Sequence, residues 1–289
     1  MVEHQPVLLE EAMELLAIRP GGIYLDCTTG PGGHSRAIAE RLEGPGRLIA
    51  RDCDRESLEL ARRNLAGLEG RIIFDAGRFS DVRLALDRLG IGKVDGLLAD
   101  LGWSMWQLRE AQRGFSFSED GPLDLRYDRT TGETAADLVN FSSEQDIVRI
   151  LTDYGEERRA RRIARAILKA RPVSTAKRLA DIVEQAKPRD SRIHPATLTF
   201  QALRIAVNDE LGELEALLAV LPEVVAEGGR AVLISFHSVE DRIVKRAFQQ
   251  LARGGRAKLL TRHVVTPRAD EVLRNPAARS ARLRALQIV

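Results

Sequence analysis

The stretch LDCTTGPGGHSRAIAE at residues 25–40 decides how the rest of the chain is interpreted. It begins as an apolar strand, passes through a glycine-rich turn and continues with helical spacing. Gly30, Gly32 and Gly33 permit positive φ angles and let a ligand approach the backbone closely. The following helix offers unpaired N–H groups and a positive potential. This pattern favours a ligand-binding turn, although such turns often do no more than connect a strand to a helix.

The chain after this turn continues to alternate between strand-like and helix-like segments. Apolar strand patterns cover residues 21–29, 46–54, 71–77 and 93–102, and helical patterns lie between them. This alternation is typical of a parallel sheet in a doubly wound α/β fold.

The alternation stops after Ser104 and resumes near Ile205. Between them, helical spacing appears at 135–141, 143–155, 156–171 and 175–186. A structureless loop of this length is improbable in a compact domain. We therefore predict an inserted helical domain at 105–205, used for substrate recognition, within a discontinuous α/β domain at 1–104 and 206–289.

The last eighty residues return to the α/β pattern. A helix ending at glycines is expected over 211–229, a fifth strand over 230–238 and a helix over 239–253. Two late strand patterns, 257–265 and 281–289, are suited to an antiparallel edge. The expected sheet is thus Rossmann-like, seven-stranded and mostly parallel.

Composition narrows the classes of protein that remain. Of the 289 residues, 44% are hydrophobic and 30% charged, which is typical of a globular chain rather than a disordered one. No apolar run approaches the roughly 18 residues of a membrane span, and acids stand where a signal peptide would be basic. We expect a cytoplasmic protein without a membrane partner. Cys27 and Cys53 are expected to be reduced thiols, and no metal-ligand pattern is present.

Positive charge is concentrated in two blocks, although the net charge is only +2. Residues 155–192 contain twelve Lys and Arg against five acids, and residues 242–284 contain twelve against two. Such blocks can indicate a polyanionic partner. They are equally consistent with helix faces that are only exposed to solvent.

The predicted strand ends place polar and aromatic residues at one edge of the sheet, where ligands bind in open parallel sheets. Asp26 precedes the glycine turn, Asp52 is positioned to take ribose hydroxyls, Phe79 offers a surface for adenine, and Asp100 ends the fourth strand. The G-x-G-x-x-G motif of pyrophosphate binders is absent. This favours an adenosine ligand without pyrophosphate, and S-adenosylmethionine fits.

Each of these residues also has a simpler interpretation. Asp52 could cap the next helix, Phe79 could belong to the core, and Asp100 could only form a turn before Gly102. His34 could be an exposed residue of the first helical turn. The adenosine site depends on all of these residues falling at successive strand ends.

Several longer motifs closely resemble the bacterial ribosomal RNA small subunit methyltransferase H family, also called MraW. The resemblance covers nearly the whole chain, in order, and its motifs are HQPVLLEEA, TGPGGHS, DLGWSMWQL, RGFSFSEDGPLDLRYD, YGEERRARRIARAI, HPATLTFQALRIAVNDEL, GGRAVLISFHSVEDRIVK and NPAARSARLRA. It implies a class I S-adenosylmethionine-dependent methyltransferase fold with an inserted helical domain. It also implies methylation of the exocyclic N4 of a cytidine in the decoding centre of 16S rRNA, within the small ribosomal subunit.

The resemblance assigns roles to individual residues. It implies cofactor binding by Gly32, Gly33, His34, Asp52, Phe79, Asp100 and Gln107. Asp100 is the catalytic candidate, because its carboxylate can hold the cytosine amine. Where the family usually has a small residue and a proline, this chain has Trp103 and Trp106, which would either stack on the base or belong to the core. Ser235, His237 and Glu240 follow the fifth strand and are candidates to hold the base edge.

Three other functions remain as alternatives. A non-catalytic rRNA-binding or assembly factor would retain the S-adenosylmethionine pocket without turnover. An NAD-linked oxidoreductase is disfavoured because the pyrophosphate motif is missing, and a DNA amino-methyltransferase because the fourth strand ends in D-L-G rather than D/N-P-P-Y/F. The oligomeric state is open, with a homodimer as one alternative.

Overall fold

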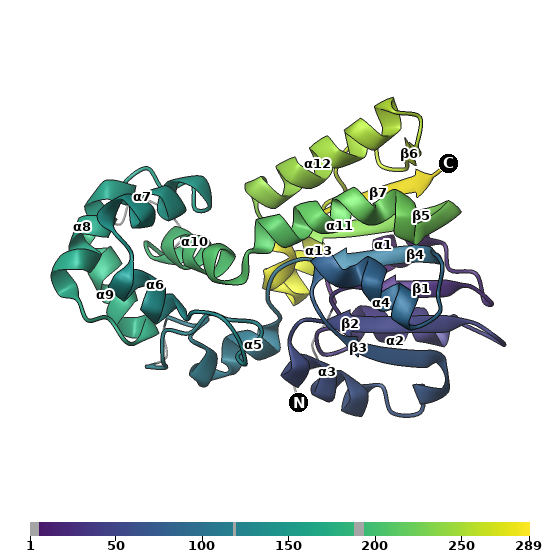
Figure 1. The fold of residues 1–289 in the computed structure, drawn as a ribbon, viewed down its shortest axis with the longest axis horizontal. Coiled ribbons are helices and arrows are strands. Elements are labelled where there is room, and N and C mark those ends of the chain that lie inside the picture. Colours follow the sequence, from purple (N-terminus) through teal and green to yellow (C-terminus); the bar gives the residue numbers. More distant parts are fainter. Residues whose placement is uncertain (1–5, 118–119, 188–193) are drawn as a thin grey trace. The chain divides into compact units, whose positions relative to one another are not determined.

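The chain forms two compact units in a computed structural model that describes residues 6–117, 120–187 and 194–289. The first unit contains residues 1–102 and 212–289, and the second contains residues 103–211 (Figure 1). The assignment of the second unit to substrate recognition stays a prediction.

The first unit is built on a seven-stranded sheet with the order β3-β2-β1-β4-β5-β7-β6. Its strands are β1 Ile23–Asp26, β2 Arg47–Asp52, β3 Ile72–Ala76, β4 Val94–Asp100, β5 Val225–Ser235, β6 Ala257–Leu259 and β7 Arg282–Ile288. The first five strands are parallel, whereas β7 is antiparallel to both β5 and β6. The predicted mostly parallel sheet with a late antiparallel edge is confirmed.

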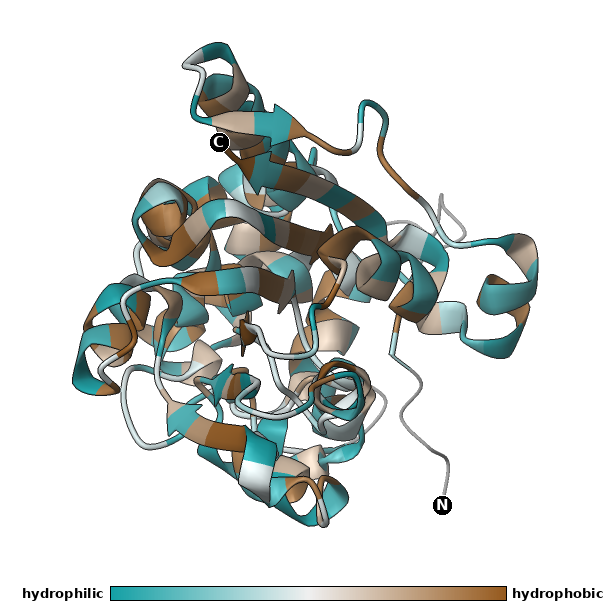
Figure 2. Ribbon diagram, turned by 90° about the vertical axis from the view of Figure 1, so that its right-hand side faces the viewer, coloured by the Kyte–Doolittle hydropathy of each residue, from teal (hydrophilic) through white to brown (hydrophobic). Residues whose placement is uncertain are grey.

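Helices cover both faces of this sheet because alternate strand residues point to opposite sides. Tyr24 and Leu98 pack with α1 Leu9–Leu16, α2 Gly33–Glu40 and α3 Arg55–Asn64. Leu25 and Leu97 pack with α4 Val82–Arg88, α11 Glu210–Val224 and α12 Ser238–Arg253. Figure 2 shows the apolar strands between helices whose outer sides are hydrophilic. Both faces are thus buried, as a parallel sheet requires.

Several element boundaries differ from the prediction. The helix expected to stop at glycines 228 and 229 ends at Val224, and β5 begins at the next residue. The apolar pattern at 257–265 forms only a three-residue strand, followed by an isolated bridge between Val265 and Leu283. Two helices that were not predicted, α1 and α13 Ala269–Arg274, complete this unit.

The second unit is helical, as predicted. Its helices are α5 Met105–Arg109, α6 Ala135–Phe141, α7 Glu144–Asp153, α8 Ala160–Ala170, α9 Ala176–Ala186 and α10 Thr197–Asn208. Four of these match the predicted helices, although α8 begins four residues later than expected, after Glu156, whose φ of 49° interrupts the helical backbone. Its core is separate from the cores of the first unit. Within the described residues, no helix is long and apolar enough to cross a membrane.

Candidate active site at the carboxyl ends of the strands

The glycine turn between β1 and α2 has the backbone conformation that its sequence favours. Gly30 has a φ of 51° and Gly32 a φ of 101°, both in the left-handed region. A Cβ on Gly32 would also lie 3.1 Å from the Leu65 side chain. The α2 helix begins at Gly33, so its free N–H groups start directly after this turn.

Asp26 is fully buried beneath the turn and connects its neighbours. Its Oδ2 accepts a 2.6 Å hydrogen bond from the Ser35 hydroxyl, and its Oδ1 accepts one of 3.1 Å from the Thr28 N–H. The Thr28 hydroxyl in turn accepts a 2.6 Å bond from the N–H of Asp100. The end of β1 therefore fixes both the first turn of α2 and the end of β4.

Burial raises the pKa of Asp26 from 3.8 to about 6, against the opposing effect of its hydrogen bonds. Because the folded state holds this proton more tightly, the contribution of Asp26 to the free energy of unfolding should fall as pH rises from about 4 to about 6, and then level off. We expect Asp26→Asn, which retains acceptor and shape, to be more stable than wild type at pH 8 by on the order of 2–3 kcal/mol. Urea denaturation at pH 5 and pH 8 measures this, and an equal loss of stability at both values would contradict it.

Asp52 ends β2 and is held by the glycine turn. Its Oδ2 accepts a 2.8 Å bond from the Gly30 N–H, and its Oδ1 a 2.9 Å bond from the Asp54 N–H. Burial raises its pKa from 3.8 to about 7. The side chain is only half-buried, and each carboxylate oxygen retains a lone pair for one further donor. The cap of α3 is instead Asp54, so the capping role considered for Asp52 is wrong.

Phe79 lies at the third strand end, where it begins a short 3-10 turn, Phe79–Asp81. Its ring is half-buried and packs partly against the core of the α4, α11 and α12 face. One side of the ring thus belongs to the core, and the remainder is open to a ligand.

Arg51 supports this third strand end and was not predicted. Its guanidinium is 1% exposed, pairs with Asp75 and Asp81, and donates a 3.0 Å bond to the Arg78 carbonyl oxygen. A Cβ on Gly77 would collide with this guanidinium. The residue before Asp52 therefore fixes the loop that presents Phe79.

The Asp100 side chain is partly exposed to solvent, and one of its oxygens has no hydrogen-bond partner among the described residues. Its side chain is 19% exposed, yet its Oδ1 is buried and has no hydrogen-bond partner among the described residues. Burial raises the pKa of this carboxyl well above its usual value, and the charges of Asp26 and Glu240 add to the effect. Such an oxygen is suited to accept a hydrogen bond from a ligand or to face a cation.

His34 lies beside Asp100 and is buried, contrary to the exposed position considered for it. Its Nε2 is 3.0 Å from the Val7 carbonyl oxygen, and its Nδ1 is 3.7 Å from Asp100 Oδ2. Because a carbonyl only accepts, Nε2 carries the hydrogen, and Nδ1 faces the carboxyl. His34 thus contributes its backbone to the turn of α2 and its ring to the environment of Asp100.

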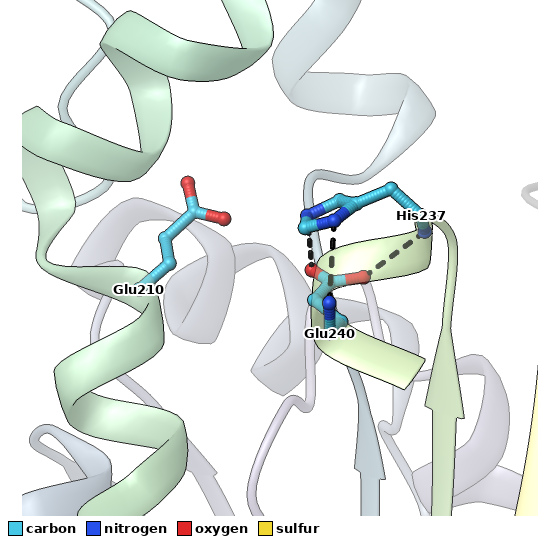
Figure 3. Close-up of side chains that lie close together, drawn as sticks. All are labelled: Glu210, His237 and Glu240. Atoms are coloured by element: carbon cyan, nitrogen blue, oxygen red, sulfur yellow. Dashed lines mark hydrogen bonds and ion pairs between the residues drawn. The ribbon is translucent and has the colours of Figure 1, made fainter. Parts of the chain in front are cut away.

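The three candidates at and directly after the end of β5 are linked to the backbone around them. The Ser235 hydroxyl donates a 3.3 Å bond to the Arg282 carbonyl oxygen. His237 and Glu240 form the capping box of α12, in which Glu240 Oε2 accepts a 3.3 Å bond from the His237 N–H and His237 Nδ1 accepts a 3.4 Å bond from the Glu240 N–H (Figure 3). Glu240 Oε2 also accepts a 2.9 Å bond from the Phe236 N–H, and its Oε1 lies 3.0 Å from His237 Nε2. Their geometry explains a local structural role, and a contact with substrate stays a proposal.

Three further candidates belong to the second unit. Gln107 is buried and forms a capping box with Ser104 at the start of α5. The Arg113 guanidinium lies 4.8 Å from the centre of the Trp106 ring, which is half-buried. Trp103 is 37% exposed. Of the two tryptophans, Trp103 therefore offers the more accessible ring.

The first unit brings most of the predicted residues into one connected group. Gly30 binds Asp52, Thr28 binds both Asp26 and Asp100, and the ring of His34 faces Asp100. Cys27 and Cys53 are both free, as expected for reduced thiols. The group has donors, acceptors and a close-packed glycine turn on the strand ends β1, β2 and β4, where an adenosine ligand would be held.

Known proteins match the chain over its full length. The model of the MraW methylase family matches residues 1–289. A ribosomal RNA small subunit methyltransferase H from Solibacter usitatus is 53% identical over 285 residues, covering 99% of both chains. One from Acidobacterium capsulatum is 50% identical, covering 98% of both.

A solved structure supports the fold independently. It is a candidate rRNA methylase from Clostridium thermocellum, with a TM-score of 0.50, 10% sequence identity and coverage of 100% of both chains. Together with the strand order, it confirms the predicted class I methyltransferase fold with a helical insertion. On the full-length match and the identities near one half, this chain belongs to the MraW methylase family.

Proposed function

We propose that this protein transfers the methyl group of S-adenosylmethionine to the exocyclic N4 of a cytidine in 16S rRNA, in the decoding centre of the small ribosomal subunit. The observation that supports this best is Asp100, whose buried and unsatisfied Oδ1 lies at the end of β4 beside the glycine turn. The relatives in Solibacter and Acidobacterium are named as small subunit rRNA methyltransferases. The place of action would be the cytoplasm.

The residues of the first unit fit S-adenosylmethionine. Asp52 retains lone pairs for two ribose hydroxyls, and Phe79 offers part of its ring to the adenine. The start of α2 at Gly33 offers N–H groups to a carboxylate. When bound, this cofactor supplies a methyl group on a cationic sulfonium. The family resemblance adds His34 and Gln107 to the same set.

The reaction mainly requires the cytosine amine to be aligned with the methyl group, because this amine is a weak nucleophile whose lone pair is delocalised into the ring. Asp100 would accept a hydrogen bond from this amine and hold it in line. A cation beside Asp100 favours its ionised form, which opposes the effect of burial on its pKa. The amine proton becomes acidic once the new bond forms, so Asp100 needs to accept it only late.

The base has to leave its stack to reach this carboxyl. The accessible ring of Trp103 is our candidate to stack on an RNA base, a contact worth roughly 1–3 kcal/mol. Ser235, His237 and Glu240 are proposed to hold the base edge through the loop they order.

Incubation with labelled S-adenosylmethionine and small subunits that lack the modification tests the proposal. We expect one methyl group per subunit, mapped to N4 of a single cytidine. Binding of the cofactor and of RNA without transfer would instead support the non-catalytic assembly factor. Transfer to DNA or only to free cytidine would overturn the choice of substrate. Gel filtration of the same preparation decides between a monomer and a homodimer.

The role proposed for Asp52 gives a separate prediction. Asp52→Ala removes both proposed hydrogen bonds to the ribose, and at about 1.5–3 kcal/mol each for a charged partner this should raise the Kd for S-adenosylmethionine by roughly 100-fold or more. Asp52→Asn retains one acceptor oxygen and should show a smaller increase. Isothermal titration measures both, with circular dichroism as the check on folding. An unchanged Kd for both variants would remove Asp52 from the site.

A further inference from the structure

The second basic block, residues 242–284, contains a small hollow on the first unit that no part of the proposed reaction uses. It measures about 30 Å³ and lies between α12, the end of β6 and β7. Its lining residues come from these three elements and the segment after β6: Lys245, Phe248, Gln249, Leu259, Thr261, Arg262 and Arg284. Three of the seven are cations.

The floor of the hollow is rigid. Phe248 is 2% exposed and belongs to the core beneath α12, and Leu259 packs against the same core. The Thr261 hydroxyl is bound to the backbone of Ala285, accepting a 3.0 Å bond from its N–H. Packed elements therefore set the backbone positions around the hollow.

The Arg284 guanidinium is held in place by Asp241 but retains N–H donors for a ligand. Its Nε and Nη2 donate bonds of 2.7 and 3.1 Å to Asp241, which also lies 3.7 Å from Arg282. A guanidinium has five N–H donors, so three remain after these two bonds. Asp241 thus orients Arg284 and offsets one charge, while Lys245 and Arg262, which line the same hollow, are exposed.

The strand register places the Arg284 end of this hollow two strands away from β4. Arg284 is paired with Leu233, and Leu233 with Ala99, the neighbour of Asp100. Two strand spacings separate the backbones of Ala99 and Arg284, which corresponds to roughly 10 Å across the sheet. An anion bound here would be held on the same unit as the proposed methyl-transfer residues.

We propose that Lys245, Arg262 and Arg284 form a binding site for one backbone phosphate of the RNA substrate. A fixed guanidinium flanked by two exposed cations is suited to a phosphodiester, which takes several charge-assisted hydrogen bonds at once. The site would anchor the strand near the target nucleotide, whereas the base itself would be recognised elsewhere. This proposal rests on the proposed function only in naming RNA as the anion.

The test is direct binding of unmodified 16S rRNA, which does not require turnover. We expect Lys245→Ala/Arg262→Ala to weaken binding at least ~10-fold and to reduce the slope of log K against log salt by about 1. The control, Arg256→Ala/Lys258→Ala, removes two exposed cations from the same unit outside the hollow, and should weaken binding less than about 3-fold. Inorganic phosphate at constant ionic strength should compete with RNA on wild type more than on the Lys245/Arg262 variant.

The results distinguish a local phosphate site from diffuse attraction. Equal losses in the two double variants would mean diffuse attraction and overturn the site. Competition by phosphate without any change in RNA affinity would mean that the hollow takes free anions, which also overturns the proposal. If wild type binds RNA and methylates it while the Lys245/Arg262 variant binds equally well, only this inference fails. If wild type binds no rRNA, the proposed function fails with it.

Discussion

Asp100→Asn is expected to lower the turnover number for methyl transfer by roughly 10²–10³-fold, the size of effect seen when one preorganised polar contact in an active site is removed. Asparagine keeps the shape of the side chain but lacks the negative charge that accepts the amine hydrogen. Single-turnover assays with small subunits that lack the modification measure the chemical step directly.

The structure of Asp100 also predicts that this loss occurs without loss of stability. Burial raises the pKa of the carboxyl, so in the free protein its ionised form is disfavoured, and a neutral amide should be tolerated at least equally well. We expect the Tm of Asp100→Asn to be equal to or above that of wild type. Asp87→Asn removes a 60% exposed carboxylate of the same unit and serves as the control, with turnover unchanged. A fully active Asp100→Asn would show that alignment does not depend on this carboxylate.

The strand ends could be predicted from the sequence because each of them is encoded locally. An apolar run followed by a polar residue and a turn marks Asp26, Asp52 and Asp100, and the strand order then brings them to one edge. The glycine turn was equally predictable, since positive φ angles are costly for other residues.

The supporting contacts were not predictable because they join residues far apart in sequence. Arg51 resembles any other strand residue until the sheet places it beneath Arg78 and Asp81. The burial of His34 depends on the carbonyl of Val7, 27 positions earlier. Such pairings follow from tertiary packing, which a local pattern does not contain.

The same limit explains the wrong expectation for the end of α11. Glycines 228 and 229 resemble a helix stop, but Val225 already joins the sheet opposite Val94, so pairing with β4 overrides the helical pattern. The pairing of Asp241 with Arg284, 43 positions away on β7, likewise has no local signal in the sequence.

The basic block of the second unit leads to the other large prediction. On α8 the buried side is apolar, with Ile163, Ala164 and Ile167, whereas Arg161, Arg162 and Lys169 are exposed on the other side. Arg165 on the same helix pairs with Glu144 at 2.9 Å. The helix thus presents one cation whose charge is offset by an acid and three that pair with no acid among the described residues. Such an excess of positive charge is typical of a phosphate-binding face.

If this face binds RNA phosphates, wild-type affinity for unmodified 16S rRNA should fall steeply with salt. Arg161→Ala/Arg162→Ala/Lys169→Ala should reduce the slope of log K against log salt by about 2–3, and weaken binding at about 0.1 M salt by roughly 10²-fold. Arg165→Ala should change neither value appreciably, because Glu144 already offsets its charge. Filter binding over a salt series measures all three proteins. If the triple variant keeps the wild-type slope, the cations of α8 face solvent without contacting RNA. Other surfaces of the protein would then bind the RNA backbone.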